Sequence, residues 1–349
     1  MRKMRYLYYV LFSVLTFFTA CDVHEWPEEE EEPEKEIVRI NLFFQTDMEE
    51  KNHFYDARSA GTTRGYEMRY LLRAFPIDSE STGRTVSRTA VWEYMFTRAV
   101  SLNDYDTSVD IEMNLPAGDY NLMVWADFVK AGKQENYFYA PDDFAEIILH
   151  GEHKANTDMR DAFHGSTEVV ATRSSVGNGT IVVKMERPLA KFTFLTTDLQ
   201  EFIDKEETKA EQNASARGET YTRGVDLDDY RVIFYYTGFM PCAYNMFTGK
   251  PNDSKTGVSF ESIITAINDS EASMGFDYVF VNGTESSASL IIALYNKEGK
   301  ELFASNPIEV PIKRSQHTIM RGEFLTIETS GGVGIVPDFD GEYNYQVKH

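Results

Sequence analysis

Apolar and polar residues alternate with a period of two along most of the chain after residue 37. The clearest run is 109–115, where four apolar residues alternate with Asp, Glu and Asn. Such a segment presents one face to a core and the other to water, as a half-buried β-strand does. The turn residues at 116–119 and a second alternating run at 120–128 predict an antiparallel hairpin with this strand.

Further runs of the same kind predict many more short strands, in two groups that meet near Arg187 and Pro188. The first group is 37–44, 67–75, 91–100, 145–149 and 180–186, and the second is 189–195, 230–236, 257–260, 277–281, 288–295, 301–304, 308–312 and 323–328. Short strands separated by Gly, Asn, Asp and Pro are typical of β-sandwiches rather than of α/β units. Two segments differ: 198–210 has the apolar spacing of a short amphipathic helix, and 259–268 is a second candidate helix.

The sequence therefore predicts an all-β fold of two tandem antiparallel β-sandwich domains with one or two short helices. A proline between two strand-like runs marks a change of sheet or of domain. We place the N-terminal domain at 37–187 and the C-terminal domain at 188–329, followed by a glycine-hinged tail at 330–349. The tail has two alternatives: it folds back onto its own C-terminal domain, or it adds as a strand to the open sheet edge of a neighbour.

The first residues have the features of a secretory signal. Arg2, Lys3 and Arg5 precede an apolar run at 6–18, and the small residue Ala20 is followed by Cys21. A cysteine in that place resembles a bacterial lipobox, which predicts a lipoprotein signal peptide at 1–20 and acylation of Cys21. The alternative is an uncleaved anchor, but the apolar run is shorter than the ~20 residues of a bilayer-spanning helix.

An acidic segment follows the cysteine at 21–36, with five consecutive glutamates at 28–32 between prolines. Dense like charge without apolar residues cannot bury enough surface to fold, so we predict an extended tether. The whole chain has a net charge of −22, which disfavours nucleic acid as a partner. The second cysteine, Cys242, lies among apolar residues and is predicted to be a buried free thiol.

Standard catalytic motifs are missing from the sequence: it has no G-x-S-x-G, H-E-x-x-H or P-loop. A cluster of imidazoles and carboxylates at 150–164 has the ligand types of a divalent metal site; it consists of His150, His153, Asp158, Asp161 and His164. Because no helix fixes their facing, we predict neither a metal nor a cofactor there. Trp92, Trp125 and the aromatic run 234–236 are candidates for stacking on sugar rings, although aromatic residues at period two are more often core.

The combination of these features resembles the fimbrillin superfamily of Bacteroidetes. The similarity rests on the lipobox, the acidic tether, and three motifs: Leu-Pro-Ala-Gly-Asp-Tyr at 115–120, Arg-Pro-Leu-Ala-Lys at 187–191 and Arg-Gly-Glu-Phe-Leu-Thr at 321–326. The resemblance implies transthyretin-like sandwiches and a role as subunit or anchor of surface fimbriae, or as a related adhesin. It also implies cleavage after an arginine in some members, for which Arg58 and Arg64 are the candidate sites.

We therefore predict a non-catalytic, lipid-anchored protein of the outer membrane, exposed at the cell surface. Its expected partners are the membrane lipid through Cys21, and either other fimbrial subunits that add a strand or host and glycan ligands. The alternative function is a surface glycan-binding lipoprotein, since extracellular β-sandwiches with exposed aromatic residues suit sugars.

Overall fold

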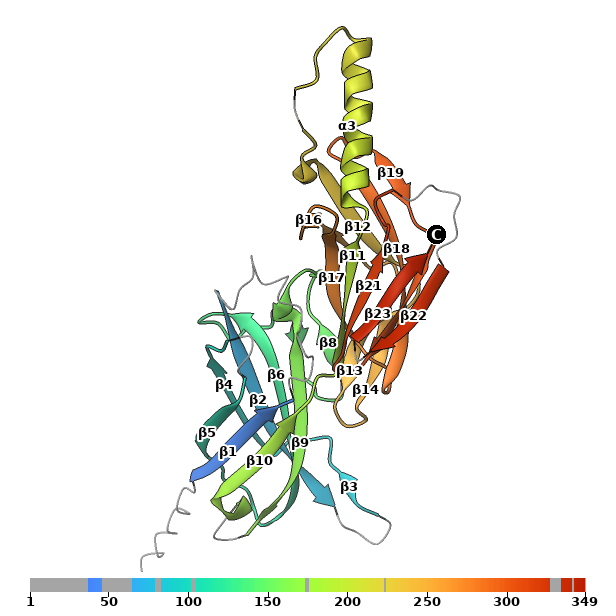
Figure 1. Cartoon of the computed structure of the whole chain (residues 1–349). Coiled ribbons are helices and arrows are strands. Elements are labelled where there is room, and N and C mark those ends of the chain that lie inside the picture. The colour runs from blue at the N-terminus through green and yellow to red at the C-terminus, as the bar shows by residue number, and fades with distance from the viewer. Residues whose placement is uncertain are drawn as a thin grey trace, which may run out of the picture.

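Two groups of β-sheets, one below the other in Figure 1, make up the protein, and the all-β prediction is confirmed. The structure is a computed structural model. It describes residues 37–45, 65–78, 83–101, 105–172, 176–222 and 224–326, and the backbone of 334–340 and 342–348. A single long helix, α3 (Leu199–Ala216), is found in these ranges and projects from the end of the C-terminal half.

The N-terminal half is a sandwich of two sheets. One has the order β10-β1-β5 and contains β1 (Ile37–Phe44), β5 (Thr107–Glu112) and β10 (Thr180–Met185). The other has the order β3-β2-β6-β9, with β4 also on β2, and contains β2 (Tyr66–Asp78), β3 (Thr85–Val86), β4 (Trp92–Arg98), β6 (Gly118–Lys130) and β9 (Ala162–Ala171). Every second residue of β1, from Val38 to Phe44, points into the core between the sheets, because side chains alternate between the two faces of a strand.

The C-terminal half is built in the same way. Its six-stranded sheet, β16-β17-β11-β21-β23-β22, contains β11 (Leu189–Thr196), β16 (Thr265–Ala266), β17 (Ala272–Phe280), β21 (His317–Gly322), β22 (Gly334–Asp340) and β23 (Glu342–Lys348). The facing sheet, β15-β12-β18-β19 with β20 on β18, contains β12 (Tyr230–Tyr236), β15 (Ser259–Ser262), β18 (Glu285–Asn296), β19 (Glu301–Ala304) and β20 (Ile308–Lys313). A second apolar core lies between them.

A fifth sheet takes strands from both halves. It has the order β14-β13-β8-β7 and contains β7 (Tyr139–Ala140), β8 (Ile147–Leu149), β13 (Met240–Asn245) and β14 (Lys250–Lys255). The core of the N-terminal half likewise includes Leu189, Tyr244 and Phe280 from later in the chain. The domain boundary at 187/188 stays a prediction; what the structure adds is that the two halves share a sheet and a core.

The predicted hairpin between 109–115 and 120–128 is wrong. β5 pairs with β1, whereas β6 pairs with β2 and β9, so the turn at 116–119 carries the chain from one sheet of the sandwich to the other. The Tyr120 hydroxyl donates a 2.7 Å hydrogen bond to the carbonyl of Pro116 and fixes this crossing, as the tyrosine corner of β-sandwiches does. Alternation reveals a half-buried strand but does not identify its partner.

Two other expectations about single elements are wrong, and a third is confirmed with a longer range. The second candidate helix is wrong, because 259–268 forms the short strands β15 and β16. The predicted strand at 323–328 is wrong in its described part, since 323–326 has no strand. The predicted helix at 198–210 is confirmed and is longer, ending at Ala216.

The tail pairs with its own C-terminal half. β22 and β23 form an antiparallel hairpin, and β23 lies parallel to β21, with Thr318 opposite Tyr343 and Gly322 opposite Val347. β1–β10 and β11–β21 are also parallel pairs within otherwise antiparallel sheets. The first of the two alternatives for the tail is therefore the one the structure shows, and the hinge residues 330–333 lie outside the described part.

Candidate functional site

Buried charges gather where the two halves meet, around Asp277 of β17. This carboxylate is fully buried and lies 2.6 Å from Nε2 of His153 and 3.0 Å from Nη1 of Arg160, and it accepts a 2.7 Å hydrogen bond from the Tyr236 hydroxyl. Burial acts to raise the pKa of Asp277, but the attraction of Arg160 and His153 and the hydrogen bonds outweigh it and lower that pKa. The carboxylate therefore stays ionised at neutral pH.

A buried ion pair within the N-terminal half and a partly buried one between the halves lie beside it. Asp161 lies 2.8 Å from Nε of Arg187, and Asp158 lies 2.8 Å from Nζ of Lys191. The Tyr278 hydroxyl donates to the same oxygen of Asp158 over 2.8 Å. Arg187 and Lys191 are thus the charged residues of the motif at 187–191. Lys191 of β11 binds the N-terminal half through Asp158, and the Ser315 hydroxyl donates to the carbonyl of Arg187 over 3.3 Å.

The metal candidates of the sequence are used in these contacts and do not converge on one point. His153, Asp158 and Asp161 each face a different partner, and His164 lies 3.1 Å from the Tyr244 hydroxyl. Within the described ranges, no group of three or more His, Cys, Asp or Glu side chains could hold a metal ion. Their chemistry is ion pairing at the junction.

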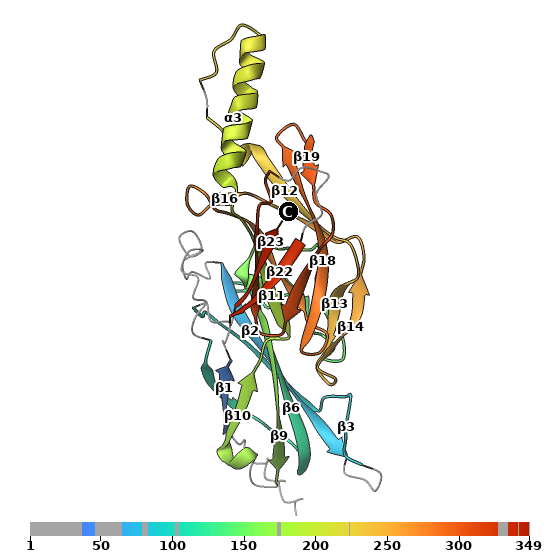
Figure 2. The ribbon, with the colours of Figure 1, turned by 45° about the vertical axis from the view of Figure 1, so that its right-hand side comes forward.

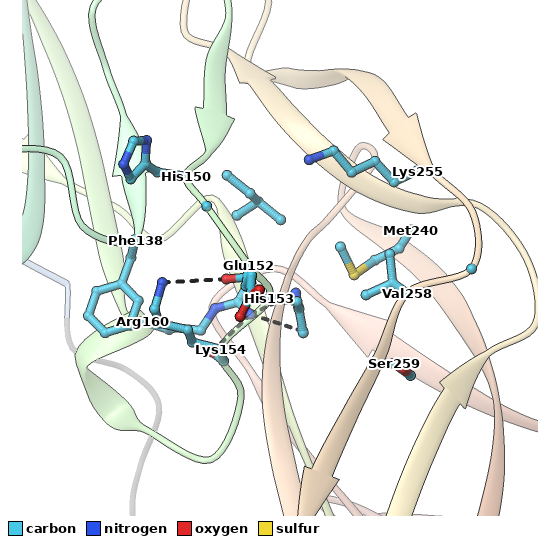
Figure 3. A pocket seen from close by; sticks show the side chains of 13 residues that line it. Phe138, His150, Glu152, His153, Lys154, Arg160, Met240, Lys255, Val258 and Ser259 are labelled. Carbon is cyan, nitrogen blue, oxygen red and sulfur yellow. Dashed lines mark hydrogen bonds between the residues drawn. The ribbon is translucent and has the colours of Figure 1, made fainter.

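A cavity of about 290 Å³ opens beside this network, between the segment after β8 and the strands β13–β15. Four apolar side chains line it: Phe138, Leu149, Met240 and Val258. His153 and Arg160 of the ion-pair network form part of its back wall (Figure 3).

The rim of the cavity carries charged and polar side chains, namely His150, Glu152, Lys154, Lys255 and Ser259. The ammonium group of Lys154 lies 3.5 Å from the carbonyl oxygen of Glu152 and 5.0 Å from the centre of the Tyr137 ring. No ion pair to a carboxylate of the described residues holds Lys154 or Lys255. The cavity therefore combines apolar walls with two cations whose hydrogen-bonding capacity is largely unused.

Most of the aromatic residues proposed as a sugar platform lie in the cores. Trp125 is fully buried, as is Phe234, and only 6% of Tyr236 is exposed. Trp92 is half-buried on β4, where its ring stacks on that of Tyr94 with centroids 6.2 Å apart. Of the predicted platform, only the half-buried Trp92 and Tyr235, which is 37% exposed, therefore reach the surface.

The remaining predicted site residues have different outcomes. Cys21, Arg58 and Arg64 lie outside the described residues, so acylation and cleavage stay predictions. Cys242 is a buried free thiol, as predicted, and burial raises its pKa. A search of the described helices finds none that is long and apolar enough to cross a membrane.

The profile of a protein family matches residues 33–348, nearly the whole chain; it is described as a family of unknown function (DUF6562). The chain belongs to this family. A comparison with curated proteins finds no match.

Several solved structures of Bacteroidetes proteins are distant neighbours of the chain. A candidate polysaccharide-binding protein from Bacteroides thetaiotaomicron is 16% identical with a TM-score of 0.41, over 76% of this chain and 79% of that chain. A candidate adhesin from Bacteroides ovatus is 11% identical with a TM-score of 0.41, over 90% and 96%. The fimbrial anchor protein Mfa2 from Porphyromonas gingivalis is 12% identical with a TM-score of 0.33, over 77% and 82%.

Sequence reasoning missed three of the residues that define the junction: Arg160, Lys255 and Asp277. Asp277 offered one signal, because a carboxylate that opens an apolar strand must find a cation once it is buried. Its partner Arg160 is 117 positions away along the chain and could not be paired with it without the fold. Lys255 ends an otherwise polar strand and gave no signal at all.

Proposed function

We propose that the protein is a cell-surface lipoprotein, held to the outer membrane through acylated Cys21, that serves without catalysis as a fimbrial subunit or anchor or as a related adhesin. The observation that carries this proposal is the place of the tether relative to the folded body. β1 follows the acidic segment directly and lies in the N-terminal half, whereas α3 projects from the opposite end (Figures 1 and 2). A body attached through β1 presents its C-terminal half away from the membrane.

The junction supports a role in presentation rather than in turnover. The carboxylates beside the junction, Asp277, Asp161 and Asp158, each form an ion pair with a cation. Such pairs hold two layers in one arrangement and leave no free acid or base among themselves. A stiff body on a charged tether suits a protein that transmits force or displays a contact surface.

Cleavage after Arg58 or Arg64 would separate Cys21 and β1 from the rest of the chain. β1 is paired on both sides, with β5 and with β10, and it places Val38, Ile40, Leu42 and Phe44 in the core. Exposing four such side chains costs roughly 6–12 kcal/mol at about 1.5–3 kcal/mol each. We therefore propose that the anchored form is uncut at both arginines, which favours an anchor over a polymerising subunit.

Metabolic labelling with a fatty-acid probe tests the anchor. The wild-type protein should be labelled and Cys21→Ala should not, while Cys242→Ala is the matched control that keeps the label. Equal labelling of the wild type and Cys21→Ala would show that the lipid assignment is wrong. Protease treatment of intact cells tests surface exposure separately, because only an exposed protein is degraded while a periplasmic marker survives.

Glycan binding is the second candidate function, and the half-buried Trp92 beside Tyr94 is the observation that favours it. Aromatic faces stack on sugar rings, and β4, which carries both residues, pairs in the described structure with β2 alone. Trp92→Ala should weaken retention in a polysaccharide gel, whereas Trp125 is core and its replacement tests only stability.

A further inference from the structure

The cavity at the junction has the chemistry of a ligand site. We propose that it binds an acidic sugar, a pyranose that carries a carboxylate, at the end of a glycan chain. This inference deepens the adhesive function proposed above by naming a ligand class. Its test measures ligand binding by the purified protein, so that anchoring and ligand recognition can fail independently.

The charge of the rim is the first argument. The chain has 56 acidic and 34 basic residues, so a hollow lined by two lysines differs in charge from the protein as a whole. Lys154 and Lys255 both line the cavity, yet no carboxylate of the described residues forms an ion pair with either. They come from opposite sides, Lys154 from the segment after β8 and Lys255 from the end of β14, and Lys255 extends toward the side that carries His150 (Figure 3). Two lysines that line one hollow of an acidic protein attract an anion to it.

The other lining residues indicate what kind of anion fits. Glu152 lines the same cavity, and its carboxylate opposes a ligand with two or more negative charges, such as phosphate. A carboxylate at this place accepts hydrogen bonds from hydroxyl groups, and Ser259 and His150 add further polar atoms. Leu149, Met240 and Val258 supply apolar surface for the C–H face of a ring. A monoanionic, hydroxyl-rich ring is the ligand that uses all three kinds of group.

The size of the cavity points to one sugar unit rather than a length of polymer. Its volume of about 290 Å³ is at the lower end of the ~300–1,000 Å³ that ligand pockets usually occupy. The back wall is fixed, because Arg160 is held by Asp277 and also donates to the carbonyls of Lys154 (3.2 Å) and Tyr278 (3.2 Å). The site is therefore formed before a ligand arrives, and the segment that carries Lys154 is held by that same arginine.

The proposal is tested by titrating the purified full chain with two acidic sugars, sodium glucuronate and the methyl glycoside of N-acetylneuraminic acid. Calorimetry or ligand-observed NMR measures the binding. We expect saturable binding of at least one acid, and binding at least tenfold weaker for glucose and for the neutral methyl ester of glucuronic acid. Lys255→Ala and Lys154→Ala should each weaken binding roughly tenfold, the effect of losing one charge-assisted hydrogen bond. Glu152→Gln should strengthen it, and added salt should weaken it.

Lys250→Ala is the matched control, because Lys250 is an exposed lysine of the same strand β14 that does not line the cavity. It should bind as the wild type does. The replaced lysines carry no ion pair of the core, so the melting temperatures of all variants should agree. The proposal is overturned if neither acid binds saturably, if the ester binds as tightly as the acid, if inorganic phosphate binds more tightly, or if the double variant Lys154→Ala/Lys255→Ala retains wild-type affinity.

Discussion

At the scale of single residues, the fold deals with buried ionisable groups in two ways. Carboxylates at the junction keep their charge because cations and hydrogen bonds surround them, as at Asp277. Two histidines are instead kept neutral. Burial lowers the pKa of His317 to about 3, with Lys191 adding to the effect and Asp158 opposing it, and burial together with Arg314 lowers the pKa of His164 to about 4. His317 is held by Thr193, whose hydroxyl lies 2.7 Å from its Nε2.

These histidines predict a loss of stability in mild acid. Both pKa values are lower in the folded chain than the ordinary value of 6.5, so the stability they contribute is present above pH 6.5 and is lost as the pH falls toward 4. At pH 5 the unfolded chain binds the protons and the folded chain does not, which lowers the free energy of unfolding by at most about 2 kcal/mol for each histidine. Urea denaturation at pH 7 and pH 5 measures this difference.

The double variant His164→Gln/His317→Gln should show a smaller loss between the two pH values, while the exposed His150→Gln should behave as the wild type. The pairs of Asp158 and Asp277 do not contribute to this difference, because the pKa values of both carboxyl groups are lowered and both are ionised at pH 5 and above. Burial instead raises the pKa of Asp161, but this carboxyl group is the same in the wild type and in the variants, so it does not affect their comparison. An unchanged pH dependence in the double variant would contradict the assignment.

At the scale of elements, the sequence predicts where strands are better than which strands pair. The sequence pattern predicts β1 and β5 as strands because one face of each strand is in water. Residues 123–129 of β6 are buried on both faces, so their pattern does not indicate which strands lie beside them. The turn before Tyr120 was taken for a hairpin because a crossing between sheets uses the same residue types. Long-range partners, such as β21 for β23, follow from packing that no local pattern contains.

The C-terminal hairpin gives the prediction at this scale. Deleting 331–349 removes β23 and uncovers the edge of β21, so we expect a loss of several degrees in the melting temperature of the purified monomer. Truncation after Val347 is the control, since it keeps all five pairs between the two strands. If the melting temperature of the monomer is unchanged and assembly at the cell surface is lost, the tail instead acts as a strand donor to a neighbour.

At the scale of the whole molecule, the two halves behave as one body because of what lies between them. A shared four-stranded sheet, a core that takes Leu189 and Phe280 from beyond the junction, and the ion pairs Arg160–Asp277 and Lys191–Asp158 all cross it. Arg187 and Lys191 belong to a motif that lies beside a proline at the predicted domain boundary. In the fold both form ion pairs with carboxylates of the N-terminal half, and the sequence alone does not reveal that these are Asp161 and Asp158.

Breaking the central pair should therefore destabilise the entire chain rather than loosen one half. Asp277→Ala leaves Arg160 buried without its charge partner, and removal of one member of such a pair costs about 3–5 kcal/mol. The double variant Asp277→Ala/Arg160→Met should recover part of the loss, because it leaves no unpaired charge. Asp110→Ala breaks the exposed pair with Arg39, which solvent screens, and should cost far less than Asp277→Ala. Calorimetry should show one unfolding transition for the wild type. For Asp277→Ala it should show a single transition at a strongly lowered temperature. Two separate transitions, or a cost no larger than that of Asp110→Ala, would refute this role of the junction.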